Sequence, residues 1–406
     1  VRCVKETDYD KKSHKKSNKG KYSRYRKIML DLTIDKGSYK QLKTAFMGGF
    51  THSNPNLTGV TLENVGSIDL TSSYPSVMCA EMYPMSRPKF LKPKSYADLK
   101  DLMKKYCIVL DVKYVGLKNT LGYESYISES KCRNLKGAVI NNGRVYEADS
   151  LEITLTDIDI NIIEKVYSWE QIAISNVRGF LKNYLPKPII ESILNLYQDK
   201  TTLKGVEGKE VEYLLSKGML NSVYGMSVTD IVKDTAIYTD EDNWDFEAVD
   251  VDDVISKYND SKNRFLYYAW GIWVTAYARR NLWTGILAVG EDYVYSDTDS
   301  IKVLNYGKHA EYVESYNKNV LSKLYKMCDV CEFDPSLLKP KTVKGEVKPL
   351  GVWEFEGTYQ KFKTLGAKRY LVLENGKYSL TVAGLSKVNG MQYMICLLYT
   401  SDAADE

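Results

Sequence analysis

The chain has 406 residues, of which 44% are hydrophobic and 27% are charged, as expected for a globular protein of two or three domains. Its seven cysteines are scattered, which argues against a disulfide framework and favours a reducing intracellular compartment. A net charge of +4 is too small to establish a polyanionic partner by itself.

The charge is unevenly distributed along the chain. Residues 1–27 carry eleven Lys and Arg against three acids, whereas residues 230–262 carry eleven acids against three Lys. The basic run can follow phosphates, although such runs are more often solvated linkers, and the acidic stretch is most simply a solvated surface insertion. The 33 tyrosines suit stacking on nucleic-acid bases and an A/T-rich coding bias equally well.

Both ends of the chain have unusual sequences. The chain opens on Val1 in a basic run without a signal peptide, and residues 396–406 resemble the translation of a sequencing adapter. We leave residues 396–406 out of the fold prediction. We expect the natural protein to continue in both directions.

The first half of the chain predicts a mixed α/β region. Pro75 suits the first turn of a helix, because a proline at that position gives up no helical hydrogen bond. The elements expected up to residue 185 are, in order, a linker with a short helix over 1–40, a glycine-bearing loop at 46–50, a strand at 65–70, a turn and helix start at 71–75, and strands at 107–115 and 151–155.

The second half predicts helices separated by a hairpin. The most apolar stretch, Phe265 to Gly290, is interrupted by Arg279 and Arg280, so we predict a buried helix and no membrane span. The expected elements are helices at 189–204 and 209–225 joined by a turn at Gly205 and Gly208, a helix at 264–289, a hairpin of 292–296 and 300–304, a helix at about 308–327, and strands at 350–355, 369–373 and 377–382.

The sharpest local feature is the hairpin tip Tyr295-Ser-Asp-Thr-Asp-Ser300. Asp297 and Asp299 stand at i and i+2, which in extended backbone places both carboxylates on one side. Apolar residues on either side of the tip, among them Val294 and Ile301, would anchor the hairpin in a core. Clustered carboxylates on a rigid tip favour Mg²⁺. A lone D-T-D is nevertheless more often a solvated turn.

A second acid changes that balance. Asp69 ends the strand Ser67-Ile-Asp-Leu70 and leads directly into a tight turn. Two acidic sites on strands far apart in sequence can converge on a pair of metal ions. Such a pair activates a hydroxyl and stabilises the leaving oxygen in an in-line phosphoryl transfer.

A predicted helix face supplies cations for phosphate. Lys217, Asn221 and Tyr224 fall at i, i+4 and i+7 and therefore share one face, while Lys200 and Lys204 repeat the i, i+4 spacing on the preceding helix. Lysine is a flexible point charge that suits phosphate. Such a face, taken alone, is more often simply solvated.

Together these segments resemble the motifs of family B DNA polymerases, in that family's order. Asp69-Leu-Thr-Ser-Ser-Tyr-Pro resembles the D-x-x-S-L-Y-P motif, and Lys217 to Gly225 matches K-x-x-x-N-S-x-Y-G. Tyr295 to Ser300 matches Y-x-D-T-D-S, and Lys368-Arg-Tyr370 resembles K-x-Y. The resemblance implies an α+β right-hand polymerase with a palm, a helical fingers hairpin and two insertions, lacking the exonuclease domain and most of the thumb.

Other segments are similar to the protein-primed phage branch. Phe46 to Phe50 resembles its Y-x-G-G loop, and Thr275-Ala-Tyr-Ala-Arg279 resembles its helix before the catalytic hairpin. The implied domains are a basic linker after a missing exonuclease domain (1–40), the loop and first palm segment (41–76), palm with a priming-protein insertion (77–188), fingers (189–225), a strand-displacement insertion (226–263), palm with the start of the thumb (264–385) and the adapter-like residues (396–406).

The resemblance also implies roles for individual residues. Asp69, Asp297 and Asp299, with the Leu70 carbonyl, would hold two Mg²⁺ ions, for which Mn²⁺ can substitute. Tyr74 would exclude a 2′-hydroxyl and so select deoxynucleotides. The other expected nucleotide contacts are Lys200, Lys217, Asn221 and Tyr224, and the expected DNA contacts are Gly48, Gly49, Phe50, Ser72, Thr275, Arg279, Lys368 and Tyr370.

The resemblance implies a DNA-directed DNA polymerase that acts as a monomer, without a membrane, in the cytoplasm of a bacterial host. Its partners would be primer-template DNA, deoxynucleoside triphosphates and a terminal priming protein. Ser73 and Phe46 depart from the motifs' Leu and Tyr. The alternatives are a host-type polymerase primed by nucleic acid and a catalytically inactive DNA-binding paralogue. Cys328 and Cys331 form a lone C-x-x-C, which we interpret as coincidental because no second pair follows.

Overall fold

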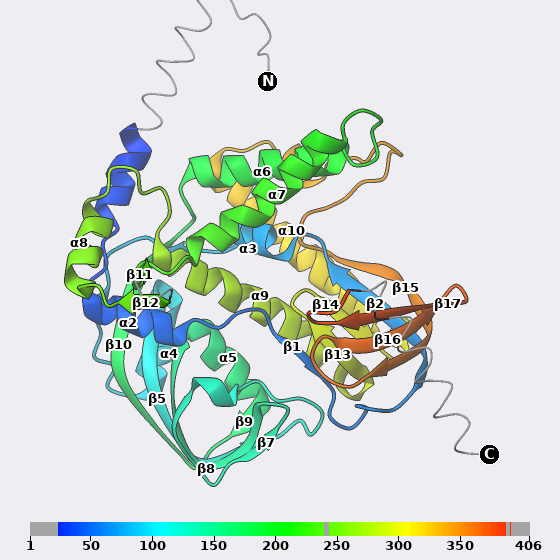
Figure 1. Ribbon diagram of the computed structural model, residues 1–406, viewed down its shortest axis with the longest axis horizontal. Helices are drawn as coiled ribbons and strands as arrows, with labels where there is room; N and C mark the ends of the chain where they lie inside the picture. The colour runs from blue at the N-terminus through cyan, green and yellow to red at the C-terminus, as the bar shows by residue number, and fades with distance from the viewer. Residues whose placement is uncertain (1–22, 239–242, 387–389, 391–406) are drawn as a thin grey trace, which may run out of the picture.

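The computed structural model describes residues 23–238, 243–386 and 390. The chain is a mixed α+β protein with two large antiparallel sheets (Figure 1). The long helix α9 (Tyr268–Val289) runs between them, and the helices α6 (Lys187–Thr202) and α7 (Glu210–Ser227) lie together above it. The predictions for residues 1–22 and 396–406 lie outside the described residues.

The N-terminal part confirms the predicted short helical segment and the glycine-bearing loop. Residues 23–31 are helical, and α2 (Lys36–Ala45) follows, with the Asp35 side chain accepting a hydrogen bond from the Ser38 amide as its N-cap. The chain then turns extended at Phe46 and passes through the loop into β1 (Thr51–Ser53). The loop therefore lies directly before β1, an edge strand of one of the two large sheets.

The seven-stranded sheet contains every strand predicted after residue 290. Its order is β1-β13-β14-β2-β15-β16-β17, with all neighbours antiparallel. The predicted hairpin is confirmed, because β13 and β14 pair directly and flank a turn. The strands after β1 are β2 (Leu62–Leu70), β13 (Tyr293–Asp297), β14 (Ser300–Val303), β15 (Trp353–Thr364), β16 (Arg369–Glu374) and β17 (Lys377–Val382).

Helix α9 is buried along most of its length, as predicted, although it starts four residues later than expected, at Tyr268 instead of residue 264. Its first half contributes Trp270 and Trp273 to one hydrophobic core, and its second half contributes Trp283 and Ile286 to another. None of the helices among the described residues is long and apolar enough to cross a membrane. The helix is therefore the element on which both cores are assembled.

Two further helices flank α9. The turn at residues 71–72 leads into α3 (Ser73–Ala80), with Pro75 in its first turn as predicted. The helix α10 (Ala310–Cys331) buries Val320 and Leu324 in the same core as the first half of α9. Among the described residues no group of three or more potential metal-ligating side chains includes Cys328 or Cys331.

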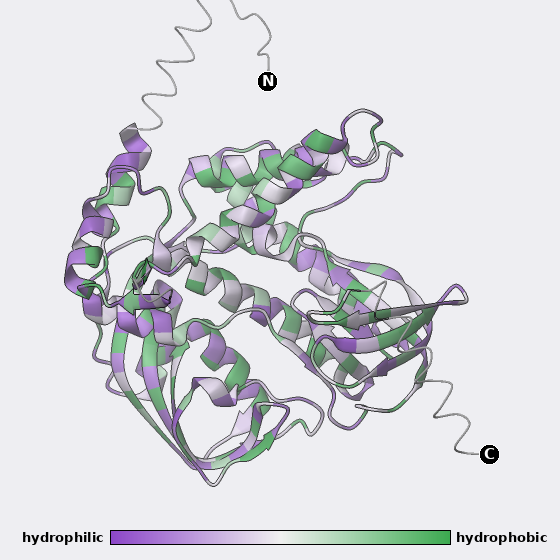
Figure 2. Ribbon diagram, viewed as in Figure 1, coloured by the Kyte–Doolittle hydropathy of each residue, from purple (hydrophilic) through white to green (hydrophobic). Residues whose placement is uncertain are grey.

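The eight-stranded sheet occupies the stretch predicted as mixed α/β. Its long strands alternate between hydrophobic and hydrophilic residues (Figure 2), as expected for a sheet with one buried face. The predicted strands at 107–115 and 151–155 are confirmed as parts of longer strands. The elements are β3 (Tyr83–Pro84), β4 (Lys89–Phe90), α4 (Tyr96–Lys105), β5 (Tyr106–Asn119), β6 (Cys132–Lys136), β7 (Val139–Asn141), β8 (Arg144–Thr156), α5 (Asp157–Val166), β9 (Tyr167–Ser168) and β10 (Gln171–Asn183).

The predicted helix pair is confirmed. Helices α6 and α7 are joined by a turn in which Gly205 and Gly208 adopt φ angles of 80° and 74°, a region that glycine enters without strain. The acidic stretch that follows forms β11 (Thr235–Tyr238), β12 (Trp244–Glu247) and α8 (Val251–Asp260). The strands of this stretch are exposed throughout, which agrees with a surface insertion.

Candidate active site

The pairing of two strands brings the predicted carboxylates together. Ser300 on β14 lies opposite Asp69 at the end of β2, and the Leu70 amide donates a hydrogen bond of 2.8 Å to the Asp299 carbonyl. Asp297 ends β13 and lies opposite Ser300 within the hairpin. Acids separated by more than two hundred residues therefore lie at one end of the sheet.

The hairpin tip is tighter than expected. Thr298 adopts a left-handed φ of 59°, and the Asp299 amide donates to the Asp297 carbonyl at 2.6 Å. Asp299 therefore belongs to the turn and not to an extended strand, so the alternation that we used to place it beside Asp297 does not apply. The proximity of the two carboxylates comes instead from the narrow turn.

Burial makes this group of acids costly in charged form. Burial, followed by the neighbouring carboxylates of Asp299 and Glu356, raises the pKa of Asp69 to about 7. Burial, followed by Asp297, raises the pKa of Asp299 to about 6. Carboxylates gathered in this way are stabilised as anions when a cation lies between them.

Two acids near Asp69 were missed from the sequence. Glu354 on β15 lies directly opposite Asp69 on β2, and Glu356 accepts a hydrogen bond of 2.7 Å from the Ser67 hydroxyl. The sequence signal was the alternation of acids in Trp353-Glu-Phe-Glu356. The sequence alone could not place these two acids beside Asp69, because their position depends on the pairing of β15 with β2.

The donor set fits Mg²⁺ in its chemistry, because it consists of carboxylate oxygens at one end of the sheet. Among residues 23–238, 243–386 and 390, no group of three or more acids, histidines or cysteines is gathered closely enough to hold a metal ion. Burial first, and neighbouring carboxylates second, raise the pKa of Asp69 and of Asp299, which is the setting in which a bound cation stabilises carboxylates as anions.

Asp297 is surrounded by hydrogen-bond donors. The Thr51 hydroxyl on β1 donates to its Oδ1 at 2.8 Å, and Lys368 Nζ lies 3.2 Å from its Oδ2. The Lys368 amide also donates to the Tyr295 hydroxyl at 3.1 Å, and the Tyr370 ring packs against the Tyr295 ring at 5.2 Å. Lys368 and Tyr370, which we expected to contact DNA, are thus attached to the β13–β14 hairpin, and the Lys368 ammonium is paired with Asp297.

A second cation near the acids was also missed. Lys302 on β14 is buried, its Nζ donates to the Ser67 hydroxyl at 2.6 Å, and burial lowers its pKa. Nothing in the local sequence distinguishes this lysine from a surface residue. Its position follows from the pairing of β14 with β2, which sets Lys302 opposite Ser67.

The two tyrosines expected at the nucleotide are in direct contact. The Tyr74 ring on α3 stacks on the Tyr224 ring on α7, with centroids 4.1 Å apart and planes inclined by 21°. A Cβ at Gly49 would lie 2.7 Å from the Thr298 hydroxyl and 3.1 Å from the Tyr74 hydroxyl. Only glycine allows the loop to approach the hairpin tip and Tyr74 so closely.

Lysines from the helix pair face the acids. Lys200 Nζ donates to the Ser72 hydroxyl at 2.8 Å, and burial, followed by the nearby Lys217 and Lys204, lowers its pKa. Lys200, Lys204, Ser72 and Asp69 line one cavity of about 640 Å³. Lys217 is exposed on α7, as is Asn221. The structure therefore sets Lys200 and Lys204 in one cavity with Asp69.

Three residues that we expected to contact DNA are buried. Phe50, Thr275 and Arg279 are 1%, 0% and 3% exposed. The Thr275 hydroxyl donates to the Ile272 carbonyl of its own helix at 3.0 Å. The expected direct contacts are thus not supported, because these side chains offer almost no surface to a strand. Gly48 and Gly49 are exposed.

Arg279 instead holds the backbone of the glycine-bearing loop through a hydrogen bond. Its guanidinium pairs with Asp159 at 2.7 Å, and it donates to the Tyr126 hydroxyl at 2.9 Å and the Gly48 carbonyl at 3.0 Å. The backbone that it holds leads directly into Phe50, whose carbonyl accepts from the Thr298 amide at 2.8 Å. The arginine therefore supports the hairpin tip through the loop.

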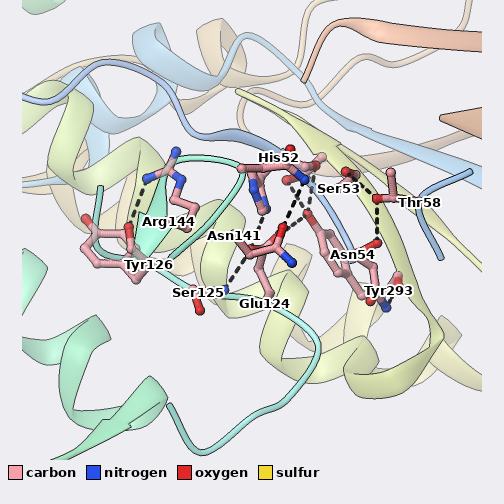
Figure 3. A network of polar contacts seen from close by, with 12 residues as sticks. His52, Ser53, Asn54, Thr58, Glu124, Ser125, Tyr126, Asn141, Arg144 and Tyr293 are labelled. Atoms are coloured by element: carbon pink, nitrogen blue, oxygen red, sulfur yellow. Dashed lines mark hydrogen bonds and ion pairs between the residues drawn. The ribbon is translucent and has the colours of Figure 1, made fainter. Parts of the chain in front are cut away.

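A buried polar network joins β1 to the eight-stranded sheet region (Figure 3). His52 Nδ1 lies 2.7 Å from Glu124 Oε1, and the Tyr293 hydroxyl donates to Glu124 Oε2 at 3.0 Å. The Tyr293 hydroxyl also lies 2.9 Å from that of Ser296, the residue before Asp297. Since the members of this network are buried, it fixes β13 and its terminal aspartate against a segment far away in sequence.

Comparison with known proteins identifies the relatives of this arrangement. Residues 10–317 match the family described as DNA polymerase type B, organellar and viral. The DNA polymerases of Bacillus phages Nf and B103 are 25% and 24% identical over 338 and 336 residues, in each case 82% of this chain and 49% of the relative. The chain thus spans about half the length of the curated relatives that it matches.

Solved structures share the fold. Phi29 DNA polymerase complexed with primer-template DNA and incoming nucleotide substrates aligns with a TM-score of 0.61 at 18% identity, covering 92% of this chain and 60% of that chain. An orthorhombic crystal form of phi29 DNA polymerase aligns with a TM-score of 0.58 at 19% identity, covering 89% of this chain and 57% of the other.

Proposed function

Because the chain belongs to the type B DNA polymerases of organelles and viruses and is of the protein-primed phage type, we propose that it carries the site of template-directed DNA synthesis. The reaction transfers a deoxynucleoside monophosphate to a primer 3′-hydroxyl, or to a hydroxyl of a priming protein, and releases pyrophosphate. The observation that carries this proposal is the pairing of Ser300 with Asp69, since it joins two acidic motifs beside the Lys200 cation.

Each group of residues has a task in this reaction. Asp69, Asp297 and Asp299 are the ligands for divalent ions, which activate the attacking hydroxyl and stabilise the leaving phosphate when bound. Thr51 and Lys368 orient Asp297 through the contacts described above. The residues that bind the nucleotide are Tyr74, Lys200, Lys217, Asn221 and Tyr224.

The relatives suggest the wider context. We propose that the whole protein acts on primer-template DNA in a bacterial host, since the matching relatives come from Bacillus phages. The segment 77–188 is the proposed docking site for a priming protein, and the segment 226–263 is the proposed strand-displacement insertion. Gly48, Gly49, Ser72, Lys368 and Tyr370 remain the proposed contacts to DNA, and such contacts bind the DNA backbone irrespective of sequence.

The direct test is incorporation of deoxynucleotides on a primed template by this chain in the presence of Mg²⁺. Replacing Asp299 with Asn removes one charged ligand and should slow synthesis by on the order of a thousandfold, because metal binding contributes several kcal/mol to the transition state. Asp329→Asn, an exposed aspartate on α10, is the matched control. Unchanged synthesis by Asp299→Asn, with thermal unfolding as in the parent, would rule out the assignment.

A further inference from the structure

A short hairpin after α10 lines the nucleotide cavity together with α6. Lys341 and Val347 form a β-bridge, the Gly345 amide donates to the Thr342 carbonyl at 2.8 Å, and Gly345 has a φ of 82°. These are the features of a type I turn followed by a glycine bulge. Val343 and Lys344 therefore occupy the tip of a turn whose backbone is well defined.

The hairpin is attached to the fingers helix and to the palm. The buried Tyr197 hydroxyl on α6 donates to the Lys348 carbonyl at 2.9 Å, and Lys348 Nζ lies 3.3 Å from Glu354 on β15. In Figure 1 the orange segment between α10 and β15 rises beside α6. These contacts fix the hairpin relative to α6 and β15.

The cavity of about 640 Å³ places a free cation on this hairpin. Its lining includes Asp69, Lys200 and Lys204 together with Val343 and Lys344 of the hairpin. Within the part of the chain that the structure describes, the Lys344 side chain has neither a hydrogen bond nor an ion pair. The amino group of Lys344 is therefore available to an anion that enters the cavity.

We propose that Lys344 is a further nucleotide-binding residue, which contacts the phosphate chain of the incoming nucleoside triphosphate in the cavity that it lines together with Lys200. This inference rests on the proposed function of the site. A triphosphate carries several negative charges, so an additional cation in the same cavity stabilises it further. Lys348 is less suited to this task, because Glu354 and Glu346 already lie within 3.3 and 3.9 Å of its ammonium.

The test compares two lysines of the same hairpin. Lys344→Gln and Lys341→Gln remove one charge each, but Lys341 is not among the residues that line the cavity. Binding of inorganic tripolyphosphate and of dAMP is measured by calorimetry on the full chain without divalent ions. Lys344→Gln should weaken tripolyphosphate binding about fivefold, the effect of an exposed ion pair of about 1 kcal/mol. Lys341→Gln should bind as the parent does, and Lys344→Arg should retain affinity.

The variant Lys200→Gln distinguishes a failure of the role proposed for Lys344 from a failure of the proposed nucleotide site. If Lys200→Gln weakens tripolyphosphate binding while Lys344→Gln binds like Lys341→Gln, the role of Lys344 is wrong and the nucleotide site stands. If the parent binds no tripolyphosphate, or if neither Lys200→Gln nor Lys344→Gln changes binding, the proposed nucleotide site is wrong together with the inference. An equal loss in affinity for dAMP would also contradict a contact with the phosphate chain.

Discussion

Tyr74 lies where three parts of the site meet. Its ring stacks on Tyr224, its hydroxyl lies close to the Gly49 backbone, and it follows Asp69 by five residues at the start of α3. Burial raises its pKa to about 12, so the hydroxyl is neutral and the ring acts by its shape. Because the Tyr74 ring is held by the Tyr224 ring and lies close to the Gly49 backbone, it can exclude an additional hydroxyl on the sugar of a nucleotide.

Replacing Tyr74 with Val should therefore increase ribonucleotide insertion. The smaller side chain opens space beside the sugar, and we expect discrimination against ribonucleotides to fall by about tenfold or more, as for other changes in pocket shape. Tyr74→Phe keeps the ring and should retain the selectivity. The ratio of kcat/KM for dNTP over rNTP measures this effect, and an unchanged ratio in Tyr74→Val would exclude the sugar-gate role.

At the scale of elements, the ion pair of Arg279 and Asp159 joins the middle of α9 to the first turn of α5. Both side chains are buried, and the arginine also holds the Gly48 carbonyl. Removing one partner of such a pair leaves a buried charge, which costs about 3–5 kcal/mol. The contact thus couples α5, the long helix α9 and the glycine loop.

A double-mutant cycle tests this coupling. Arg279→Leu and Asp159→Leu should each lower the free energy of unfolding by about 3–5 kcal/mol, and the double variant should lose less than the sum. Arg133 and Asp111, an exposed pair at 3.4 Å, form the control cycle, in which we expect about 1 kcal/mol or less. Urea unfolding gives the four free energies. Additive losses in the Arg279 cycle would contradict a direct pair.

The elements that the sequence predicted well have local signals. The β13–β14 hairpin, the Pro75 helix start and the glycine turn between α6 and α7 follow from turn chemistry and periodicity over a few residues. Glu356 and Lys302 escaped prediction because their places depend on pairing between distant strands, and the β15–β2 register even shifts between Phe355 and Gly357. No local pattern encodes such a register.

The burial of Thr275 and Arg279, which we expected to contact DNA, has a related cause. Thr275 lies between α9 residues of one hydrophobic core and Arg279 lies between that core and the next, so tertiary packing decides their exposure. The match to the family motifs suggested that both residues contact DNA, but it could not show that the rest of the protein buries them. The placement of Asp299 in a tight turn was likewise hidden, because the alternation rule assumes an extended strand.

At the scale of the whole molecule, the chain combines a complete set of site motifs with about half the length of its relatives. Residues 10–317 match the family, and the fold aligns over 92% of the chain. The acids at the end of the sheet, Lys200 of α6 and the glycine loop converge from segments that extend from Gly49 to Asp299. This convergence is what makes the carboxylates a candidate polymerase site instead of a solvated turn.

The most direct test of the central claim is a crystal structure of the chain with Mn²⁺ and a non-hydrolysable deoxynucleoside triphosphate. The anomalous scattering of manganese locates the ions independently of any model of the chain. We predict two peaks roughly 3.5–4 Å apart, both within bonding distance of Asp69 and Asp299, with the triphosphate on the side of Lys200. Nucleotide bound without manganese at these carboxylates, or manganese bound elsewhere, would contradict the account.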